Sequence, residues 1–176
     1  MSDYDVVDQV VIDAEPEVVW QAILAEFRGA RRWWVPHNTF CPGAVPSDRV
    51  GGEVTVTVHT RGVAQRGLRL RFTARTREVA PARRLVADYV AGAFRGSSDY
   101  SLDPLDGGTR TRLSLHWQAR PQGWVGVLAH AVDIGQEHSR ATIQAFDNLG
   151  ALIGGRTARR SPELATITAV GIKEPC

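Results

Sequence analysis

Histidine is the first side chain to consider, because imidazole can act as an acid, a base or a metal ligand near neutral pH. The chain has five, and they are His37, His59, His116, His130 and His138. None has the HxH or HExxH spacing of a zinc site, so no metal is predicted. His59 and His116 fall on the polar faces of predicted strands, where we expect solvent. His138 lies beside the apolar stripe of a predicted helix. If the true buried stripe is shifted by one residue from the predicted one, the His138 side chain points inward.

Two phenols, Tyr89 and Tyr100, are the best polar candidates on inward strand faces. A buried phenol needs a hydrogen-bond partner, which would be a ligand carbonyl or, alternatively, the protein backbone. An enzyme could use such a phenol as a proton donor. Asp88 and Asp99 fall on the outward-facing positions of their strands, where we expect solvent. No pair of carboxylates that would face each other inside the protein can be identified. Catalytic residues therefore stay unknown.

Two further groups of residues allow two interpretations each. The pair Trp33-Trp34 precedes a proline-rich loop, so it could stack on a flat ligand at the opening of a cavity or anchor the core. Rows of arginine around Arg71 and Arg112 could bind an acidic partner or lipid headgroups. Such rows are more often the solvated face of a sheet, balanced by nearby acids.

Composition narrows the class of protein. A chain of 176 residues, with 43% hydrophobic and 23% charged residues, is one folded domain with or without a tail. A net charge of +2 is too balanced for a nucleic-acid binder. Neither a membrane span nor a signal peptide is recognisable, so we expect a cytoplasmic protein without stable membrane insertion. Lys173 is the only lysine, and this preference for arginine indicates a bacterial source.

The N-terminal quarter predicts a strand followed by two short helices. Tyr4 to Ala14 is rich in β-branched residues, and Pro16 then opens a helix that Gly29 ends. Residues 31–34 are expected to form a second short helix. Residues 36–52, which contain several prolines and glycines, are expected to be a loop.

In residues 53–117 apolar and polar residues alternate with a period of two, which predicts five strands joined by short turns. Consecutive strands with short links form an antiparallel meander with one apolar face. The side chains expected on that face are Val54, Val56, Val58, Leu68, Leu70, Phe72, Tyr89, Phe94, Tyr100, Leu113, Leu115 and Trp117.

The C-terminal third predicts one long helix over residues 124–153 that ends at Gly154-Gly155. Its apolar stripe is expected to be Leu128, Val132, Gly135, Ser139, Thr142, Phe146, Leu149 and Ile153. His130 and Asp133, one turn apart, are expected as an exposed pair. Residues 156–176 are assigned as a C-terminal tail, separate from a domain over residues 1–155.

This order of elements resembles the START-like, or SRPBCC, superfamily. The segment from Val10 to Trp20 looks like that family's first strand and helix, an apolar strand followed by A-x-P-x-x-V-W. The segment from Leu102 to Leu113 looks like its penultimate hairpin. The branch most similar is the polyketide cyclase/dehydrase and lipid-transport group. The resemblance implies an α+β helix-grip fold, a curved antiparallel sheet of about six to seven strands around a long C-terminal helix.

The resemblance also implies an apolar cavity between sheet and helix that binds a hydrophobic, lipid-like or polyketide-like molecule without a cofactor. The alternation of residues supplies its lining. The expected ligand contacts are Trp33, Trp34, Phe72, Tyr89, Phe94, Tyr100, Leu115, Trp117, Val132, Thr142 and Phe146.

Three functions remain open at this point. A carrier or sensor should have an almost wholly apolar cavity with a wide opening. A cofactor-free cyclase or dehydrase should bring titratable groups such as tyrosine and histidine together at the cavity. A protein-interaction module should have a filled groove and an exposed apolar patch. The apolar lining favours the carrier, expected as a monomer or weak homodimer.

Overall fold

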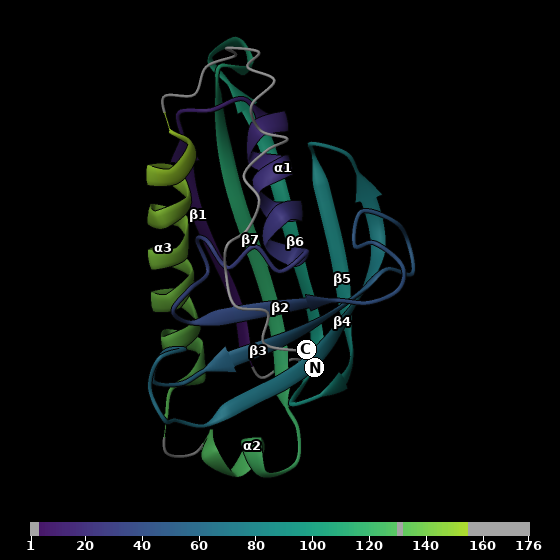
Figure 1. The fold of residues 1–176 in the computed structure, drawn as a ribbon, viewed down its shortest axis with the longest axis vertical. Coiled ribbons are helices and arrows are strands. Elements are labelled where there is room, and N and C mark those ends of the chain that lie inside the picture. The colour runs from purple at the N-terminus through teal and green to yellow at the C-terminus, as the bar shows by residue number, and fades with distance from the viewer. Residues whose placement is uncertain (1–3, 130–131, 155–176) are drawn as a thin grey trace.

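The computed structural model describes residues 4–129 and 132–154. The chain begins with β1 (Tyr4–Ile12) and α1 (Pro16–Phe27). The strands that follow are β2 (Asn38–Pro42), β3 (Glu53–His59), β4 (Arg69–Ala80), β5 (Arg84–Gly92), β6 (Phe94–Leu105) and β7 (Arg110–Pro121). A single 3-10 turn, Asp106–Gly108, joins β6 to β7. The helices α2 (Trp124–Leu128) and α3 (Ile134–Ile153) come last (Figure 1).

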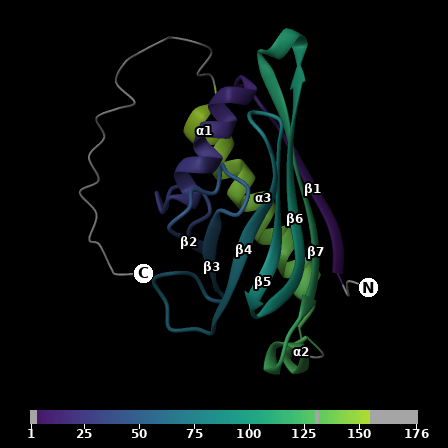
Figure 2. The ribbon, with the colours of Figure 1, turned by 90° about the vertical axis from the view of Figure 1, so that its right-hand side faces the viewer.

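These strands form one antiparallel sheet in the order β1-β7-β6-β5-β4-β3-β2. The N-terminal strand pairs with β7, so the first and last strands of the described residues lie side by side. Figure 2 shows that α1 and α3 lie on the same face of the curled sheet. The helix-grip α+β fold predicted from the order of elements is therefore confirmed.

The curl of the sheet has local causes in the chain. The pairing of β4 with β5 shifts register between Thr73 and Ala74 and again between Thr76 and Glu78, and such bulges bend and twist a strand. In β6, Gly96 has a φ of 137°, and a Cβ atom there would lie 2.0 Å from the carbonyl oxygen of Gln118. Only glycine fits this close approach of β6 to β7.

The two faces of the sheet separate apolar from charged side chains, as the period of two predicts. In β7, Leu113, Leu115 and Trp117 are buried, whereas Arg110 and Arg112 point outward. The outward arginines pair with acids at the surface. The pairs are Arg75 with Glu53 at 2.6 Å, Arg77 with Asp88 at 3.2 Å and Arg110 with Asp13 at 2.9 Å. This pairing fits the balanced, solvated face rather than a surface reserved for an acidic partner.

Between α1 and β3 the structure differs from the sequence prediction. Residues 31–37 form bends and turns, not a second helix, because the left-handed φ values of Gly29 and Arg31 end the helical path. Part of the predicted loop is the edge strand β2, which pairs with β3 from Asn38 to Pro42. The backbone hydrogen bonds of β3 at the sheet edge are satisfied in this way.

The predicted long helix is divided into α2 and α3. Asp133 caps α3, because its side chain accepts a hydrogen bond from the backbone N–H of Gln136 at 3.0 Å. A capping aspartate starts a new helix rather than continuing the old one. His130 and the side chain of Leu128 lie outside the described part of the chain, as does the tail assigned to residues 156–176.

The second half of α3 belongs to a fully packed core. Phe146, Leu149 and Ile153 are buried there against residues of α1 such as Ile23. Trp33 completes this packing, since its ring centroid lies 6.5 Å from that of Phe146 and its Nε1 donates to the carbonyl of Ala22. Among the residues that the structure describes, no helix is both long and apolar enough to cross a membrane.

Candidate ligand-binding cavity

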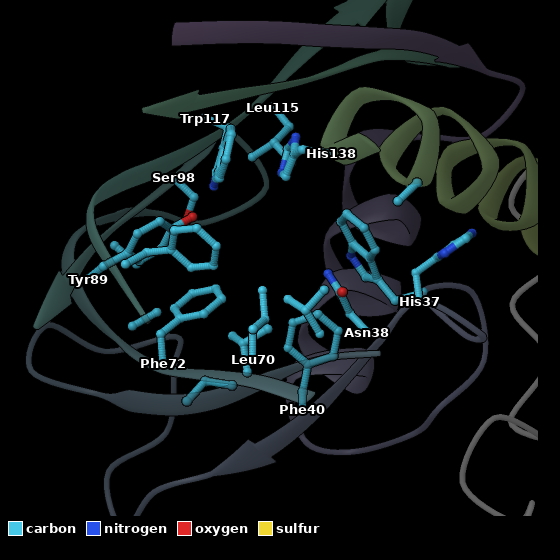
Figure 3. A pocket seen from close by; sticks show the side chains of 18 of the residues that line it. His37, Asn38, Phe40, Leu70, Phe72, Tyr89, Ser98, Leu115, Trp117 and His138 are labelled. Atoms are coloured by element: carbon cyan, nitrogen blue, oxygen red, sulfur yellow. The ribbon is translucent and has the colours of Figure 1, made fainter. Parts of the chain in front are cut away.

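A cavity of about 420 Å³ lies between the concave face of the sheet and the first two turns of α3 (Figure 3). Its volume falls in the range of small-molecule sites, roughly 300–1,000 Å³. Apolar and aromatic side chains make up most of the wall. From α3 only Ile134, Glu137, His138 and Ala141 contribute.

Most of the predicted contact residues lie on this wall. The predicted contact residues that lie on the wall are Trp34, Phe72, Tyr89, Phe94, Tyr100, Leu115, Trp117 and Val132. Those that belong to strands point inward, as the alternation of apolar and polar residues predicted. The wall is aromatic as well as apolar, with Phe72 packed against Tyr89 at 4.6 Å between ring centroids. Such walls offer a large contact area for a flat ligand with little loss of rotamer entropy.

Three of the predicted contact residues do not reach the cavity. Trp33, Thr142 and Phe146 lie in the packed core beside it. The cavity ends at Ala141, because the following turns of α3 pack directly against α1 and the sheet. A helical stripe in the sequence cannot tell which of its turns face a void.

The opening of the cavity is marked by wall residues that are also exposed. Val132 is 42% exposed, and Leu68 and Arg61 are exposed on the connection between β3 and β4. The cavity therefore opens between this connection and the start of α3. Trp34 is only 2% exposed, so of its two interpretations the position at the opening is wrong, and the residue lies deep inside.

The imidazole of His59 also contradicts the sequence prediction, because it is buried and lines the cavity. Its Nε2 lies 2.9 Å from the hydroxyl of Thr39 on the unforeseen strand β2. Burial lowers the pKa of His59, and the nearby charges of Arg69, Arg31 and Arg71 lower it further. His116 lies on the outer face as predicted, with Asp5 at 2.6 Å.

A second histidine on the wall is His138. Its ring stacks on Trp117 with centroids 4.0 Å apart and planes 7° apart. Its Nδ1 lies 3.4 Å from the hydroxyl of Thr142 and 3.9 Å from a carboxylate oxygen of Asp8. The side chain is 16% exposed, and burial lowers the pKa of His138 to about 3. The imidazole is therefore neutral at physiological pH and able to accept a proton or a hydrogen bond.

Asp8 is a buried carboxylate that the sequence analysis missed. It accepts a hydrogen bond from the hydroxyl of Ser139 at 3.1 Å, and burial raises its pKa. The signal was available, because Asp8 shares the phase of Val6, Val10 and Ile12 on the inner face of β1. The run of valines predicts the strand, and its phase places Asp8 on the inner face.

Glu26 was missed in the same way, although it follows Ile23 by three residues on the buried side of α1. Its carboxylate is 1% exposed and accepts hydrogen bonds from the backbone N–H groups of Arg32 and Trp34, at 2.9 and 3.0 Å. Burial raises the pKa of Glu26 despite these bonds. The carboxylate thus fixes the segment that carries Trp34 into the cavity wall.

The two phenols of the cavity are both buried. Burial raises the pKa of Tyr89 and of Tyr100, so both hydroxyls keep their protons at physiological pH. A neutral imidazole and two neutral phenols thus share one apolar cavity. In the described ranges no three histidine, cysteine or acidic side chains are grouped so as to hold a metal ion.

Acid is expected to destabilise the protein through His138. The pKa is about 3 in the folded chain against an ordinary value of 6.5, so the unfolded chain takes up the proton first as the pH falls. The contribution of His138 to the free energy of unfolding is complete above pH 6.5, and it is lost progressively as the pH falls from 6.5 to about 3. We expect His138→Phe, which keeps a ring on Trp117, to flatten the pH dependence of urea unfolding across about pH 5 to 7.

The comparison of wild type with His138→Phe isolates this effect. The raised pKa values of Asp8 and Glu26 act in the opposite direction, because those groups lose stability as the pH rises above their ordinary values. Glu26 contributes equally to both proteins and cancels in the difference, and the comparison is made on an Asp8→Asn background because Asp8 lies 3.9 Å from the imidazole of His138. Equal slopes in the two proteins would show that His138 titrates normally in the folded state.

Solved structures with the same arrangement exist for several proteins. Protein CV1439 from Chromobacterium violaceum matches with a TM-score of 0.61 and 21% identity, over 85% of this chain and 96% of that one. A START superfamily protein from Mycobacterium smegmatis matches with a TM-score of 0.60 and 15% identity, over 85% and 98% of the two chains. TTHA0849 from Thermus thermophilus matches with a TM-score of 0.58 and 16% identity, over 85% of this chain and 99% of that one. At these identities the likeness shows the fold alone.

The sequence itself identifies the family. Residues 4–146 match the family described as polyketide cyclase / dehydrase and lipid transport, and the chain belongs to this family. No curated protein matches the sequence. The resemblance inferred from the first strand, the first helix and the penultimate hairpin is therefore confirmed.

Proposed function

We propose that the protein binds a flat or elongated hydrophobic small molecule in the cavity between the sheet and α3, as a carrier or sensor. The observation that carries this proposal is the cavity of about 420 Å³ with its aromatic wall. An unfilled apolar space of this size costs packing energy, which a bound ligand restores. The family, which includes lipid transport, supports the same function. The ligand-binding unit proposed here is the domain of residues 1–155.

Mass spectrometry of the protein under native conditions, after purification from its own host, tests this function directly. We expect an apolar small molecule to co-purify, or the purified protein to bind apolar probes. A protein that carries no ligand and binds no apolar probe would refute the proposal.

A second candidate is a cofactor-free cyclase or dehydrase. It is favoured by the presence of His138, Tyr89 and Tyr100 on one cavity wall. A neutral imidazole can act as a general base and a neutral phenol as a general acid in the loss of water. The lowered pKa of His138 makes its imidazole a weak base, which places this function second. Loss of water from a bound polyketide-like substrate, detected by mass spectrometry, would distinguish this function from carriage. The filled groove expected of an interaction module is not what the structure shows.

Replacing Trp117 with alanine is expected to weaken the binding of an apolar fluorescent probe by about 1–3 kcal/mol, through lost contact area. Trp117 lines the cavity between Phe94, at 6.0 Å between ring centroids, and His138. A fluorescence titration measures the change. His116→Ala removes the neighbouring side chain on the outer face and is the control. The proposed site would be wrong if His116→Ala reduced binding and Trp117→Ala did not.

A further inference from the structure

One end of the molecule exposes apolar side chains to solvent, and it is the end at which the cavity opens. Figure 2 shows α2 and the connection from β3 to β4 at this end of the sheet. Trp124 and Val127 of α2 are 56% and 74% exposed, and Leu68 on the connection is 49% exposed. Leu68 also lines the opening, together with Val132. A group of exposed apolar side chains of this kind marks an interaction surface.

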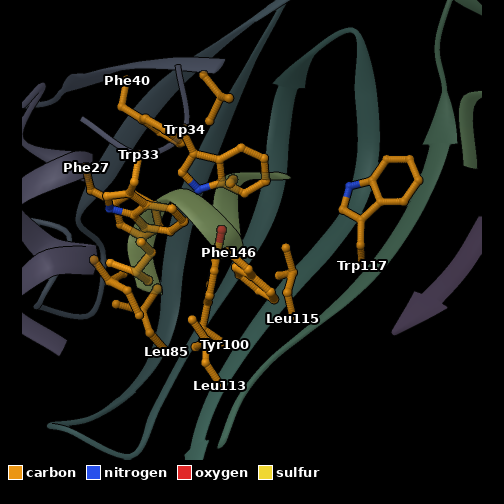
Figure 4. Close-up of a cluster of buried hydrophobic side chains, with 14 of the residues drawn as sticks. Phe27, Trp33, Trp34, Phe40, Leu85, Tyr100, Leu113, Leu115, Trp117 and Phe146 are labelled. Carbon is orange, nitrogen blue, oxygen red and sulfur yellow. The ribbon is translucent and has the colours of Figure 1, made fainter. Parts of the chain in front are cut away.

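Trp124 is the exception among the five tryptophans of the chain. The other four are 1–3% exposed, and Figure 4 shows three of them in a cluster of buried side chains. Trp124 shares one face of α2 with Val127, which follows it by three residues. Val125, between them, is 1% exposed and anchors the helix to the core. The fold therefore presents the indole of Trp124 to solvent on a firmly attached helix.

Arginines without acidic partners surround these apolar groups. Three stretches of chain meet at this end, residues 59–72, 91–96 and 118–129, and together they contain six arginines and no aspartate or glutamate. In the part of the chain that the structure describes, Arg69 and Arg71 are exposed and form no ion pair. This end therefore carries an uncompensated positive charge, which attracts an anionic surface.

The positive charges and the apolar side chains belong to one continuous surface. A hollow on the outside of the protein is lined by Arg69, Arg71 and Trp124 together. Backbone hydrogen bonds hold the three stretches in place, because the N–H of Ala93 donates to the carbonyl of Arg71 and the N–H of Gln122 donates to the carbonyl of Ala93, each at 2.8 Å. The arginines of β4 are thus fixed beside α2.

We propose that this end of the protein docks on the surface of an anionic phospholipid bilayer. The docking surface consists of Arg61, Leu68, Arg69, Arg71, Trp124 and Val127. Its arginines contact the negatively charged headgroups, while its apolar side chains enter the boundary between headgroups and acyl chains, where tryptophan is favoured. The contact is peripheral and needs no helix that spans the membrane. Docking goes beyond the proposed function and does not depend on which molecule the cavity holds.

Other partners fit this surface less well. A second copy of the chain would bring two basic surfaces together, and like charges across an interface repel. A soluble polyanion such as a nucleic acid would engage the arginines but would leave the aliphatic side chains of Leu68 and Val127 without a partner. An anionic bilayer offers both negative charge and an apolar layer, which are the two properties that the docking surface combines.

Co-sedimentation of the full chain with lipid vesicles tests the docking. We expect the wild type to bind vesicles of equal parts phosphatidylglycerol and phosphatidylcholine at least about tenfold more tightly than vesicles of phosphatidylcholine alone, and rising salt should weaken this binding. Replacing both Arg69 and Arg71 with glutamine should lower the affinity about 30-fold. Trp124→Ala should lower it about tenfold, because the apolar anchor is lost.

The matched control removes the same charge from another part of the same strand. Arg75 and Arg77 lie on the outer face of β4 but pair with Glu53 and Asp88, so replacing both with glutamine should change the affinity less than about twofold. The emission of Trp124 is a second readout. It should shift to shorter wavelength on anionic vesicles in the wild type and not in Trp124→Phe, since the other four tryptophans are already buried.

The outcomes separate docking from the proposed function, because binding of apolar probes in the cavity is measured without vesicles. Failure to bind anionic vesicles, or an equal loss of affinity in the Arg69/Arg71 and Arg75/Arg77 variants, overturns the docking surface and leaves the proposed function standing. Binding that survives Trp124→Ala but is abolished by heparin, a soluble polyanion, identifies a polyanion as the partner and overturns the bilayer. If a variant does not fold, the wild-type emission decides, and an unshifted spectrum on anionic vesicles overturns the proposal.

Discussion

Replacing Glu26 with alanine is expected to lower the free energy of unfolding by about 2–6 kcal/mol, because two backbone N–H groups lose their acceptor at about 1–3 kcal/mol each. These are the N–H groups of Arg32 and Trp34. The loss should also release the segment that carries Trp34, so probe binding should weaken in the protein that remains folded. Urea unfolding and a probe titration on the same samples measure both effects.

Gln21→Ala is the matched control for this change, since Gln21 is exposed on the same helix and bonds only to Glu17 in the described structure. Surface changes of this kind are usually worth less than about 0.5 kcal/mol. If Glu26→Ala unfolded at the same urea concentration as Gln21→Ala, the carboxylate would not be what holds residues 31–37 in place.

Phe146→Ala is expected to be the second large effect, with a loss of about 3–5 kcal/mol of stability from removed contacts and the void left behind. Phe146 is buried in the packed part of the core against Trp33. Because Phe146 does not line the cavity, probe binding at a temperature where the variant is folded should stay close to that of the wild type. Thermal unfolding and titration together check this pair of results.

Ile143→Ala supplies the comparison on the same helix, because Ile143 is 52% exposed. It should shift the unfolding midpoint far less than Phe146→Ala. Equal shifts in the two variants would mean that α3 presents a different face to the sheet from the one described.

The sequence was sufficient for the parts of the fold where one physical signal dominates. Strands β6 and β7 and the first residues of β4 bury one face and expose the other, so a period of two placed Phe72, Tyr100 and Trp117 correctly. Strand β5 departs from this pattern, because Leu85, Val86 and Ala87 are all buried. The turn at Asp106-Gly107-Gly108 also joins two adjacent strands as predicted. Local propensity and tertiary burial favour the same structure in these elements.

Where the sequence analysis failed, tertiary contacts outweighed local patterns. Strand β2 exists because β3 offers it an edge, and its five residues carry too little pattern to be recognised alone. Residues 31–37 are shaped by hydrogen bonds to Glu26, which comes from a different element. The break before α3 depends on the cap at Asp133, which a continuous apolar stripe conceals.

The candidate site shows the same division. Phase along a strand predicted which side chains face inward, but it could not predict where the interior is filled and where it is empty. Trp33 and Trp34 are neighbours in the chain, yet one lies in the packed core and the other on the cavity wall. The phase of β3 assigns His59 to solvent, but its imidazole is buried and lies 2.9 Å from the hydroxyl of Thr39 on β2, a strand that the sequence did not predict.

The separation of a packed end of α3 from a hollow end has an evolutionary consequence. Residues that hold the fold together, such as Phe146 and Leu149, are distinct from those that would touch a ligand, such as Val56 and Leu70. Mutations on the cavity wall remove fewer packing contacts than mutations in the filled core, so selection for a new ligand meets less resistance from selection for folding. A combinatorial library confined to the wall should accordingly retain a high proportion of folded members while its binding preferences diversify.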